Sequence, residues 1–316
     1  MTALSYLANP TTTRTTLERF GLATKKSLGQ NFLVNDAIIQ KICDLAELSK
    51  DDFVLEVGPG IGTLTVALLQ KAGWVFSVER DTDLPKVLAY TCEEWNDHFS
   101  LVNKDALDLN LDDLKNAAKN LEKTSAIDSQ MLPNKFVANL PYAVAATLIL
   151  AYFQSFDSLQ EATVMVQAEV ADRIAAVPGT KNYGAYTVKL SLYTQVAGRF
   201  KVSPNNFFAP PRVDSAVVHL VRRNSEKLLS LTPQQRLSIC EITDAAFASR
   251  RKTISNSCKT YFAGRGNQGK QLASLVLDIL HEAGIDERRR GETLTLDEFV
   301  DLGLVYHKIK CSLNAE

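Results

Sequence analysis

The segment Asn139-Leu140-Pro141-Tyr142 combines residue types that could hold and aim a flat polar ring. It follows the apolar run 136–138 and precedes a stretch of helical character, so it should lie where a parallel strand ends. Open α/β sheets bind ligands at that edge, and a carboxamide beside an aromatic ring suits a base with an exocyclic amine. Ordinary turns between a strand and a helix use the same residue types, so further support is needed.

That support comes from glycines at alternate positions, Gly58, Gly60 and Gly62, which follow a short apolar run. Glycine lets the backbone bend sharply and approach a ligand closely. A dinucleotide-binding loop would carry its third glycine at position 63, which is Thr63 here. The spacing therefore disfavours a nicotinamide oxidoreductase and favours a loop that binds S-adenosylmethionine.

Two acids follow at the ends of the next predicted strands. Glu79 ends the segment 74–79, and Asp105 follows the segment 99–103. A carboxylate at the first position can accept from both hydroxyls of a ribose, as in dinucleotide folds, and one at the second can accept from an adenine amino group. Either acid alone would be an ordinary solvated strand end, but their order after the glycines predicts a nucleoside-containing cofactor.

Composition and length indicate the class of protein. The 316 residues, 46% of them hydrophobic, predict about two globular domains. No apolar run approaches the ~20 residues of a membrane span, so we expect no membrane association. The five cysteines and four histidines are scattered, so we expect no metal site, no disulfide framework and a cytoplasmic location. A leader in the Thr-rich start is the less favoured alternative.

The expected fold class is α/β, a Rossmann-like sheet with helices on both faces, because strands and helices alternate. The predicted strands are 53–57, 74–79, 99–103, 135–139, 162–167, 198–202 and 215–221. After residue 223 every predicted element is helical. We therefore expect a cofactor-binding domain over 1–223, with 1–24 as an N-terminal extension, and a smaller all-helical domain over 224–316.

Local charge in this helical part points to nucleic acid, although the net charge of −1 does not. The stretch 245–277 holds no acid but six cations, among them Arg250, Arg251 and Lys252. We expect these three to lie on a helix and to contact nucleic-acid phosphates. Three adjacent positions spread over about 200° around a helix, so two contacts are expected, with the third side chain in solvent or paired within the domain.

A Pro-rich loop between the last two predicted strands carries adjacent rings, Phe207 and Phe208. Polar and Pro neighbours favour exposure of at least one ring, and stacking on a base is a sequence-tolerant use for it. The alternative is that both rings fill the core.

Four segments in order resemble the small-subunit ribosomal RNA adenine dimethyltransferases, in their bacterial branch. They are Lys25-Lys26-Ser27-Leu28-Gly29-Gln30-Asn31-Phe32-Leu33, Glu56-Val57-Gly58-Pro59-Gly60, Asn139-Leu140-Pro141-Tyr142 and Phe207-Phe208-Ala209-Pro210-Pro211-Arg212-Val213-Asp214-Ser215. The resemblance implies transfer of methyl groups from S-adenosylmethionine to N6 of two adjacent adenines in the 3′-terminal hairpin loop of small-subunit rRNA. Each adenine receives two methyls, late in small-subunit assembly. Because the RNA substrate is single-copy, we expect a monomer acting on the pre-ribosomal small subunit.

The resemblance also implies residue roles. It assigns Asn31 and Leu33 to the methionine end of the cofactor, Gly58 to its backbone cradle, Glu79 to the ribose, Asp105 to the adenine, and Asn139 to both cofactor and target. Phe208 stands where Thr is more usual in the family, and we expect Phe207 to be the stacking ring.

The expected chemistry starts from the weak nucleophilicity of an adenine amine, whose lone pair is delocalised into the ring. The Asn139 side-chain oxygen and the Leu140 carbonyl would accept its protons, while Pro141 fixes the turn. Tyr142 and Phe207 would sandwich the base outside its stack. The cofactor carries an already activated methyl group, so no general base is expected.

Two other functions stay open: a methylase of a large-subunit rRNA adenine, and an assembly factor that acts mainly by binding. The basic helical tail and the run Pro210-Pro211-Arg212-Val213-Asp214 favour the small subunit. The intact glycine loop and the segment 139–142 argue against loss of the chemistry.

Overall fold

The computed structural model describes residues 3–23, 30–123, 127–128 and 130–315. Lys25-Lys26-Ser27-Leu28-Gly29, from the first family-like segment, lie outside the described residues. The chain forms two compact units, the first Met1–Ala171 with Gln195–Arg222 and the second Asp172–Thr194 with Arg223–Glu316. The expectation of an uninterrupted first domain over 1–223 is corrected for 172–194. This segment belongs to the helical unit because Tyr183 and Val188 are buried in that unit's core.

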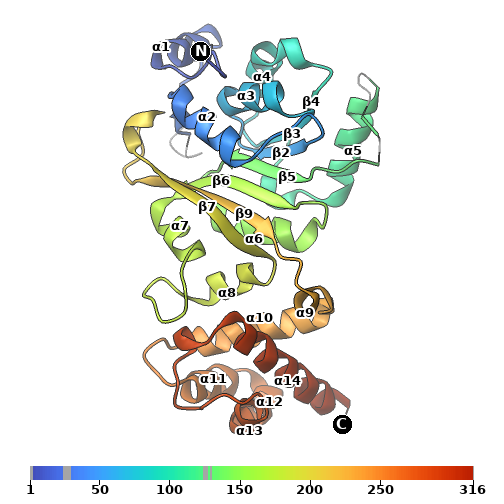
Figure 1. Ribbon diagram of the computed structural model, residues 1–316, viewed down its shortest axis with the longest axis vertical. Helices are drawn as coiled ribbons and strands as arrows, with labels where there is room; N and C mark the ends of the chain where they lie inside the picture. The colour runs from blue at the N-terminus through green and yellow to red at the C-terminus, as the bar shows by residue number, and fades with distance from the viewer. Residues whose placement is uncertain (1–2, 24–29, 124–126, 129, 316) are drawn as a thin grey trace. The chain divides into compact units, whose positions relative to one another are not determined.

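The first unit is built on a seven-stranded sheet of order β4-β3-β2-β5-β6-β9-β7 (Figure 1). The strands are β2 (Phe53–Val57), β3 (Trp74–Glu79), β4 (Phe99–Asn103), β5 (Lys135–Asn139), β6 (Glu161–Gln167), β7 (Thr194–Val202) and β9 (Ser215–Arg222). In this order each neighbouring pair among β4, β3, β2, β5 and β6 is parallel. Strand β9 pairs antiparallel to β6. All five residues of β2 are buried, as expected for a central parallel strand. The predicted α/β class is confirmed.

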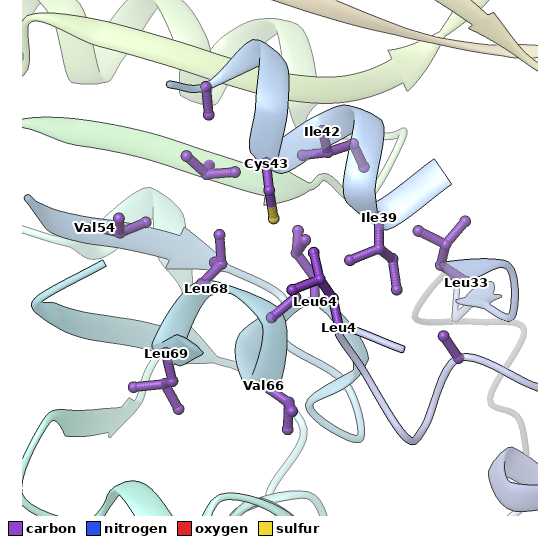
Figure 2. Close-up of a cluster of buried hydrophobic side chains, with 14 of the residues drawn as sticks. Leu4, Leu33, Ile39, Ile42, Cys43, Val54, Leu64, Val66, Leu68 and Leu69 are labelled. Atoms are coloured by element: carbon purple, nitrogen blue, oxygen red, sulfur yellow. The ribbon is translucent and has the colours of Figure 1, made fainter. Parts of the chain in front are cut away.

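Helices cover this sheet on both faces, with α2, α3 and α4 on one side and α6 on the other (Figure 1). The helices of the unit are α1 (Pro10–Arg19), α2 (Asp36–Leu45), α3 (Thr63–Lys71), α4 (Pro85–Thr91), α5 (Leu111–Glu122) and α6 (Ala145–Ser155), with α7 (Ala168–Ile174) spanning the division between the units. Figure 2 shows Ile39 and Ile42 of α2 and Leu64 and Leu68 of α3 in one buried cluster. This packing fixes where α3 begins relative to the sheet.

A second, two-stranded sheet joins distant segments of the same unit. Strand β1 (Phe32–Leu33) pairs antiparallel with β8 (Phe207–Phe208), so that Leu33 faces Phe207 across the ladder. The family-like segment near residue 31 is thereby tied to the Pro-rich loop.

The second unit is all helical in the part that the structure describes, which confirms the expected character of its C-terminal portion. Its helices are α8 (Ala185–Ser191), α9 (Glu226–Leu229), α10 (Pro233–Phe247), α11 (Ile254–Ala263), α12 (Gly266–Ser274), α13 (Val276–Glu282) and α14 (Leu296–Ala315). Stacked rings hold its core together, with the Phe262 and Tyr306 centroids 5.5 Å apart.

Strand β5, which leads into the segment 139–142, begins with a buried cation. Lys135 is only 9% exposed. Its Nζ donates to the carbonyls of Ala46 at 2.8 Å and Glu47 at 2.9 Å, and lies 3.2 Å from the Glu161 carboxylate and 3.6 Å from that of Asp52. One ammonium group thus anchors the start of β5 to its surroundings.

Replacing Lys135 with Ala should destabilise the first unit by about 3–5 kcal/mol, because the buried Asp52 carboxylate and two carbonyls would lose their cationic partner. Denaturant unfolding can be followed by tryptophan fluorescence, since Trp74 and Trp95 both belong to this unit. The control is Lys115→Ala on the exposed face of α5, which should change stability by less than about 0.5 kcal/mol. Equal effects of the two substitutions would contradict the anchoring role.

Candidate cofactor-binding and active site

A cavity of about 510 Å³ opens where the parallel strands end. Its lining includes nine of the residues singled out from the sequence: Asn31, Leu33, Gly58, Glu79, Asp105, Asn139, Leu140, Pro141 and Tyr142. They come from segments that are far apart in the chain, and the sheet brings them to one place. Their individual roles remain predictions.

The glycine loop forms one wall of the cavity in a conformation that favours glycine. Gly58 and Gly60 have φ values of +70° and +62°, in the left-handed region that other residues rarely adopt. A Cβ atom on Gly60 would lie 2.9 Å from Phe32 Cε1, and one on Gly58 would lie 3.5 Å from Pro141 Cδ. The loop therefore leaves backbone, rather than side chains, to meet a ligand.

Glu79 lies at the end of β3 and is only 7% exposed. Its Oε1 accepts the Asp81 N–H at 2.8 Å, and its Oε2 accepts the Gly60 N–H at 3.3 Å. Burial raises the pKa of this carboxyl, and the backbone N–H donors partly offset that effect. The carboxylate is thus held in position beside the glycine loop.

Asp105 caps the short 3-10 helix Ala106–Asp108 with Oδ1, which accepts the Leu107 N–H at 3.0 Å. Its Oδ2 lies 3.3 Å from the exposed guanidinium of Arg80. Both residues line the cavity, so Arg80 is a candidate contact that the sequence reasoning did not identify.

The segment 139–142 is braced from several elements. Asn139 Nδ2 donates to the Asn31 carbonyl at 3.3 Å, and the Leu140 N–H donates to the Met165 carbonyl of β6 at 3.1 Å. The Tyr142 hydroxyl lies 2.5 Å from Ser215 Oγ of β9. Because Asn139 Nδ2 donates to a carbonyl, the two ends of the amide are distinguished, and Oδ1 is the end that can accept from an amine.

Phe207 does not occupy the place expected for a stacking ring. It is 3% exposed, belongs to the core cluster shared by α2 and α3, and is not part of the cavity lining. Pairing with Leu33 turns its side chain inward. The expectation that Phe207 stacks on a base is therefore wrong for the structure described. The half-buried Phe208 packs near Phe32 instead.

Arg250, Arg251 and Lys252 lie in the turn between α10 and α11, and the expectation that they lie on a helix is wrong. Thr253 caps α11, since its side chain accepts the Asn256 N–H, and the chain cannot continue as one helix through this cap. Arg250 donates to the Tyr183 carbonyl at 2.9 Å and to Glu292 at 3.0 Å. Arg251 and Lys252 are exposed and form no ion pair with the described carboxylates.

Glu56 is a functional candidate to which the sequence reasoning gave no role. It lines the cavity although it is only 1% exposed, and its Oε2 accepts from Thr65 Oγ1 at 2.8 Å and Ser77 Oγ at 2.7 Å. Burial raises its pKa to about 7, despite these hydrogen bonds. An acid inside an otherwise apolar strand was the available signal.

No group of His, Cys, Asp and Glu side chains among the described residues could hold a metal ion. None of the helices in the described chain has both the length and the apolar character needed to cross a bilayer.

A Rossmann-like sheet with a glycine loop, an acid after the second strand and this cavity defines an S-adenosylmethionine-dependent methyltransferase. Solved structures share the fold. A dimethyladenosine transferase from Plasmodium falciparum aligns with a TM-score of 0.71 at 24% identity, covering 88% of this chain and 98% of that one. The 23S rRNA methyltransferase ErmE aligns with a TM-score of 0.59 at 24% identity, covering 87% and 99%.

Residues 21–301 match the ribosomal RNA adenine dimethylase family. Curated relatives include Ribosomal RNA small subunit methyltransferase A of Enterococcus faecalis, 37% identical over 98% of this chain and 99% of that protein. The protein of the same name from Clostridium botulinum is 37% identical over 91% of this chain and 95% of its own length. The chain therefore belongs to the ribosomal RNA adenine dimethylase family.

Replacing Glu56 with Gln should remove a stability penalty that depends on pH. The folded-state pKa of about 7 lies above the ordinary value of 4.5 for this carboxyl, so the folded protein is most stable below about pH 4.5 and loses stability as the pH rises to 7. As the pH rises from 5 to 8, the free energy of unfolding of the variant should increase by about 1–3 kcal/mol relative to that of the wild type. Denaturant unfolding of both proteins at pH 5 and pH 8 checks this. Glu79, whose pKa is also raised, is unchanged in the variant, so its contribution cancels in the comparison. Parallel stability curves would contradict it.

Proposed function

We propose that the chain dimethylates N6 of two adjacent adenines in the 3′-terminal hairpin loop of small-subunit rRNA, using S-adenosylmethionine. The observation that carries the proposal is that the Asn139 amide, whose Nδ2 donates to the Asn31 carbonyl, lines the same cavity as the glycine loop. The relatives named as small subunit methyltransferases support the small subunit as substrate. We place the reaction in the cytoplasm, late in assembly of the subunit, with the enzyme acting as a monomer.

The residues present fit S-adenosylmethionine. The left-handed glycines leave open backbone at one wall, where a Cβ at Gly60 would collide with Phe32. Glu79 would accept from the ribose hydroxyls and Asp105 from the adenine amino group, with Gly58 as part of the backbone cradle. Asn31 and Leu33 would lie along the methionine part. When bound, the cofactor supplies a methyl group on a sulfonium, which is already activated for transfer.

The side chains and backbone of the protein would then hold and polarise the target amine. Asn139 Oδ1 and the Leu140 carbonyl would each accept one N6 hydrogen, which moves electron density toward the nitrogen lone pair. Pro141 fixes the turn that presents both oxygens, and the Tyr142 ring would stack on the base. Holding the amine in line with the methyl group supplies most of the acceleration, as a proximity effect.

The proposal is tested with radioactive S-adenosylmethionine and small subunits from cells that lack the enzyme. We expect two labelled methyl groups on each of two adjacent adenines, located by mass spectrometry of RNA fragments. Large subunits serve as the parallel substrate. Label confined to large subunits would establish the alternative methylase, and tight binding to small subunits without label would favour an assembly factor.

Replacing Asn139 with Ala should lower single-turnover methylation by about a hundred-fold, the typical effect of losing one hydrogen bond made in the transition state. RNA affinity should change little, because the amide contributes to aiming the amine rather than to backbone contacts. Rapid-quench assays and filter binding measure the two quantities. Asn120→Ala, an exposed amide on α5, is the matched control. Near-normal turnover in Asn139→Ala would refute the proposed role.

We further propose that Arg251 and Lys252 contact rRNA phosphates, while Arg250 is held within the unit by Glu292 and the Tyr183 carbonyl. The double change to Ala should flatten the dependence of log K on log salt by about two units of slope. Arg288→Ala with Arg290→Ala removes the same charge from another exposed turn and should leave the slope unchanged. Equal slopes for wild type and the Arg251/Lys252 variant would exclude phosphate contacts.

A further inference from the structure

Gln167 is a polar residue of the cavity that lies outside the set predicted from the sequence. It ends β6, is half-buried, and lines the cavity together with Asn139 and Tyr142. Its side-chain amide has no hydrogen-bond partner among the described residues, whereas the amide of Asn139 donates to the Asn31 carbonyl. Gln167 therefore brings two uncommitted N–H donors and one oxygen acceptor to the site.

Strand register places the Gln167 side chain on the same face of the sheet as that of Asn139. Asn139 of β5 lies opposite Met165 of β6, and side chains two positions apart on a strand share a face. Across the next pair, Gln167 lies directly opposite Ser215 of β9, and the Cβ atoms of such opposed residues are about 4.5–5.5 Å apart. The Ser215 hydroxyl is the group that holds the Tyr142 hydroxyl at 2.5 Å. The amide thus neighbours the ring proposed to stack on the target base.

An adenine held by its amine presents a ring nitrogen on each side of that amine, N1 on one side and N7 on the other. Both nitrogens are acceptors, so each needs a donor from the protein. Asn139 Oδ1 and the Leu140 carbonyl are acceptors and cannot serve. Gln30, Arg80 and Lys104 also line the cavity, but they are paired with acids. A free amide suits the task, because amide side chains recognise adenine through its amine and a ring nitrogen.

We propose that Gln167 recognises the target base by donating from Nε2 to a ring nitrogen beside the N6 amine. The inference rests on the proposed function and adds a recognition residue to the same cavity. This hydrogen bond lies in the plane of the base, whereas the Tyr142 ring contacts its face. Cytosine also carries an amine with two hydrogens, which Asn139 and Leu140 would accept equally well. A bond to N7 excludes cytosine, which has a C–H group at the corresponding position.

Single-turnover methylation of small subunits that carry adenosine analogues tests this. The subunits are reconstituted with rRNA whose 3′-terminal hairpin comes from a ligated synthetic fragment. The two target adenosines are replaced by 7-deazaadenosine or by 1-deazaadenosine, each of which exchanges one ring nitrogen for C–H and keeps the amine. Gln167→Leu and Gln167→Met remove the amide at similar size. Gln154→Leu makes the same change at an exposed position of α6 and is the matched control.

The quantity compared is the rate on natural RNA divided by the rate on the analogue. For one of the two analogues, this ratio should be about ten-fold larger for the wild type than for Gln167→Leu or Gln167→Met. The reason is that only the wild type loses a hydrogen bond when the ring nitrogen is absent. Any difference in amine reactivity between the analogue and adenosine cancels in the comparison. Gln154→Leu should keep the wild-type ratio. Ratios that are the same for all proteins with both analogues would overturn the inference.

Two further readouts separate this result from damage to the cofactor site and from failure of the proposed function. Titration with S-adenosylhomocysteine should give the same Kd for Gln167→Leu and the wild type, and a weaker Kd would place the amide on the cofactor and overturn the inference. If the wild type does not methylate natural RNA, the proposed function is refuted and the inference with it. Normal methylation by the wild type with equal ratios refutes the inference alone.

Discussion

The placement of β5 directly beside β2 is the constraint on which the whole site depends. The two strands pair in parallel, with Leu55 opposite Phe136. From β2 the chain moves outward through β3 and β4, then returns to β5 on the other side of β2. This reversal of strand order leaves a crevice at the carboxyl ends. It is why Gly58 and Pro141, far apart in sequence, come into contact range. At the opposite end of β5, the buried Lys135 holds the strand start to the chain near Asp52.

The cavity concentrates carboxyl groups in a poorly solvated place, and this has an electrostatic consequence. Burial raises the pKa values of Glu56 and Glu79. The charge of Glu79 raises the pKa of Glu56 further, and the charge of Asp81 raises that of Glu79. Arg80 and Lys104 also line the cavity, but their ion pairs are with Asp105 and Asp113 and not with Glu56 or Glu79. A ligand with a sulfonium and an ammonium group supplies positive charge, so binding should lower both pKa values and release part of the desolvation penalty. The acids thus make the empty protein less stable and the cofactor complex more favourable.

The sequence predicted the sheet well because its central strands are continuous apolar runs ended by glycine, acid or amide. Strand bounds at 53–57, 74–79, 99–103 and 135–139 coincide with β2 to β5. Features set by distant contacts were missed. Phe207 is buried because it pairs with Leu33, and no local pattern around it signals that partner. The cap at Thr253 interrupts the basic segment, which charge counting cannot detect.

The burial of Phe207 changes how a base would be selected in the proposed reaction. A sandwich of two rings would hold any base, because every base has a π face. Among the described cavity residues, Tyr142 is the aromatic side chain that follows the acceptor amide, and its hydroxyl is fixed to Ser215. Discrimination then falls on hydrogen bonding. Two oxygen acceptors, from Asn139 and Leu140, match a base that offers two amine hydrogens and mismatch one that offers a carbonyl. A carbonyl would leave both acceptors unpaired, which costs more than the loss of stacking.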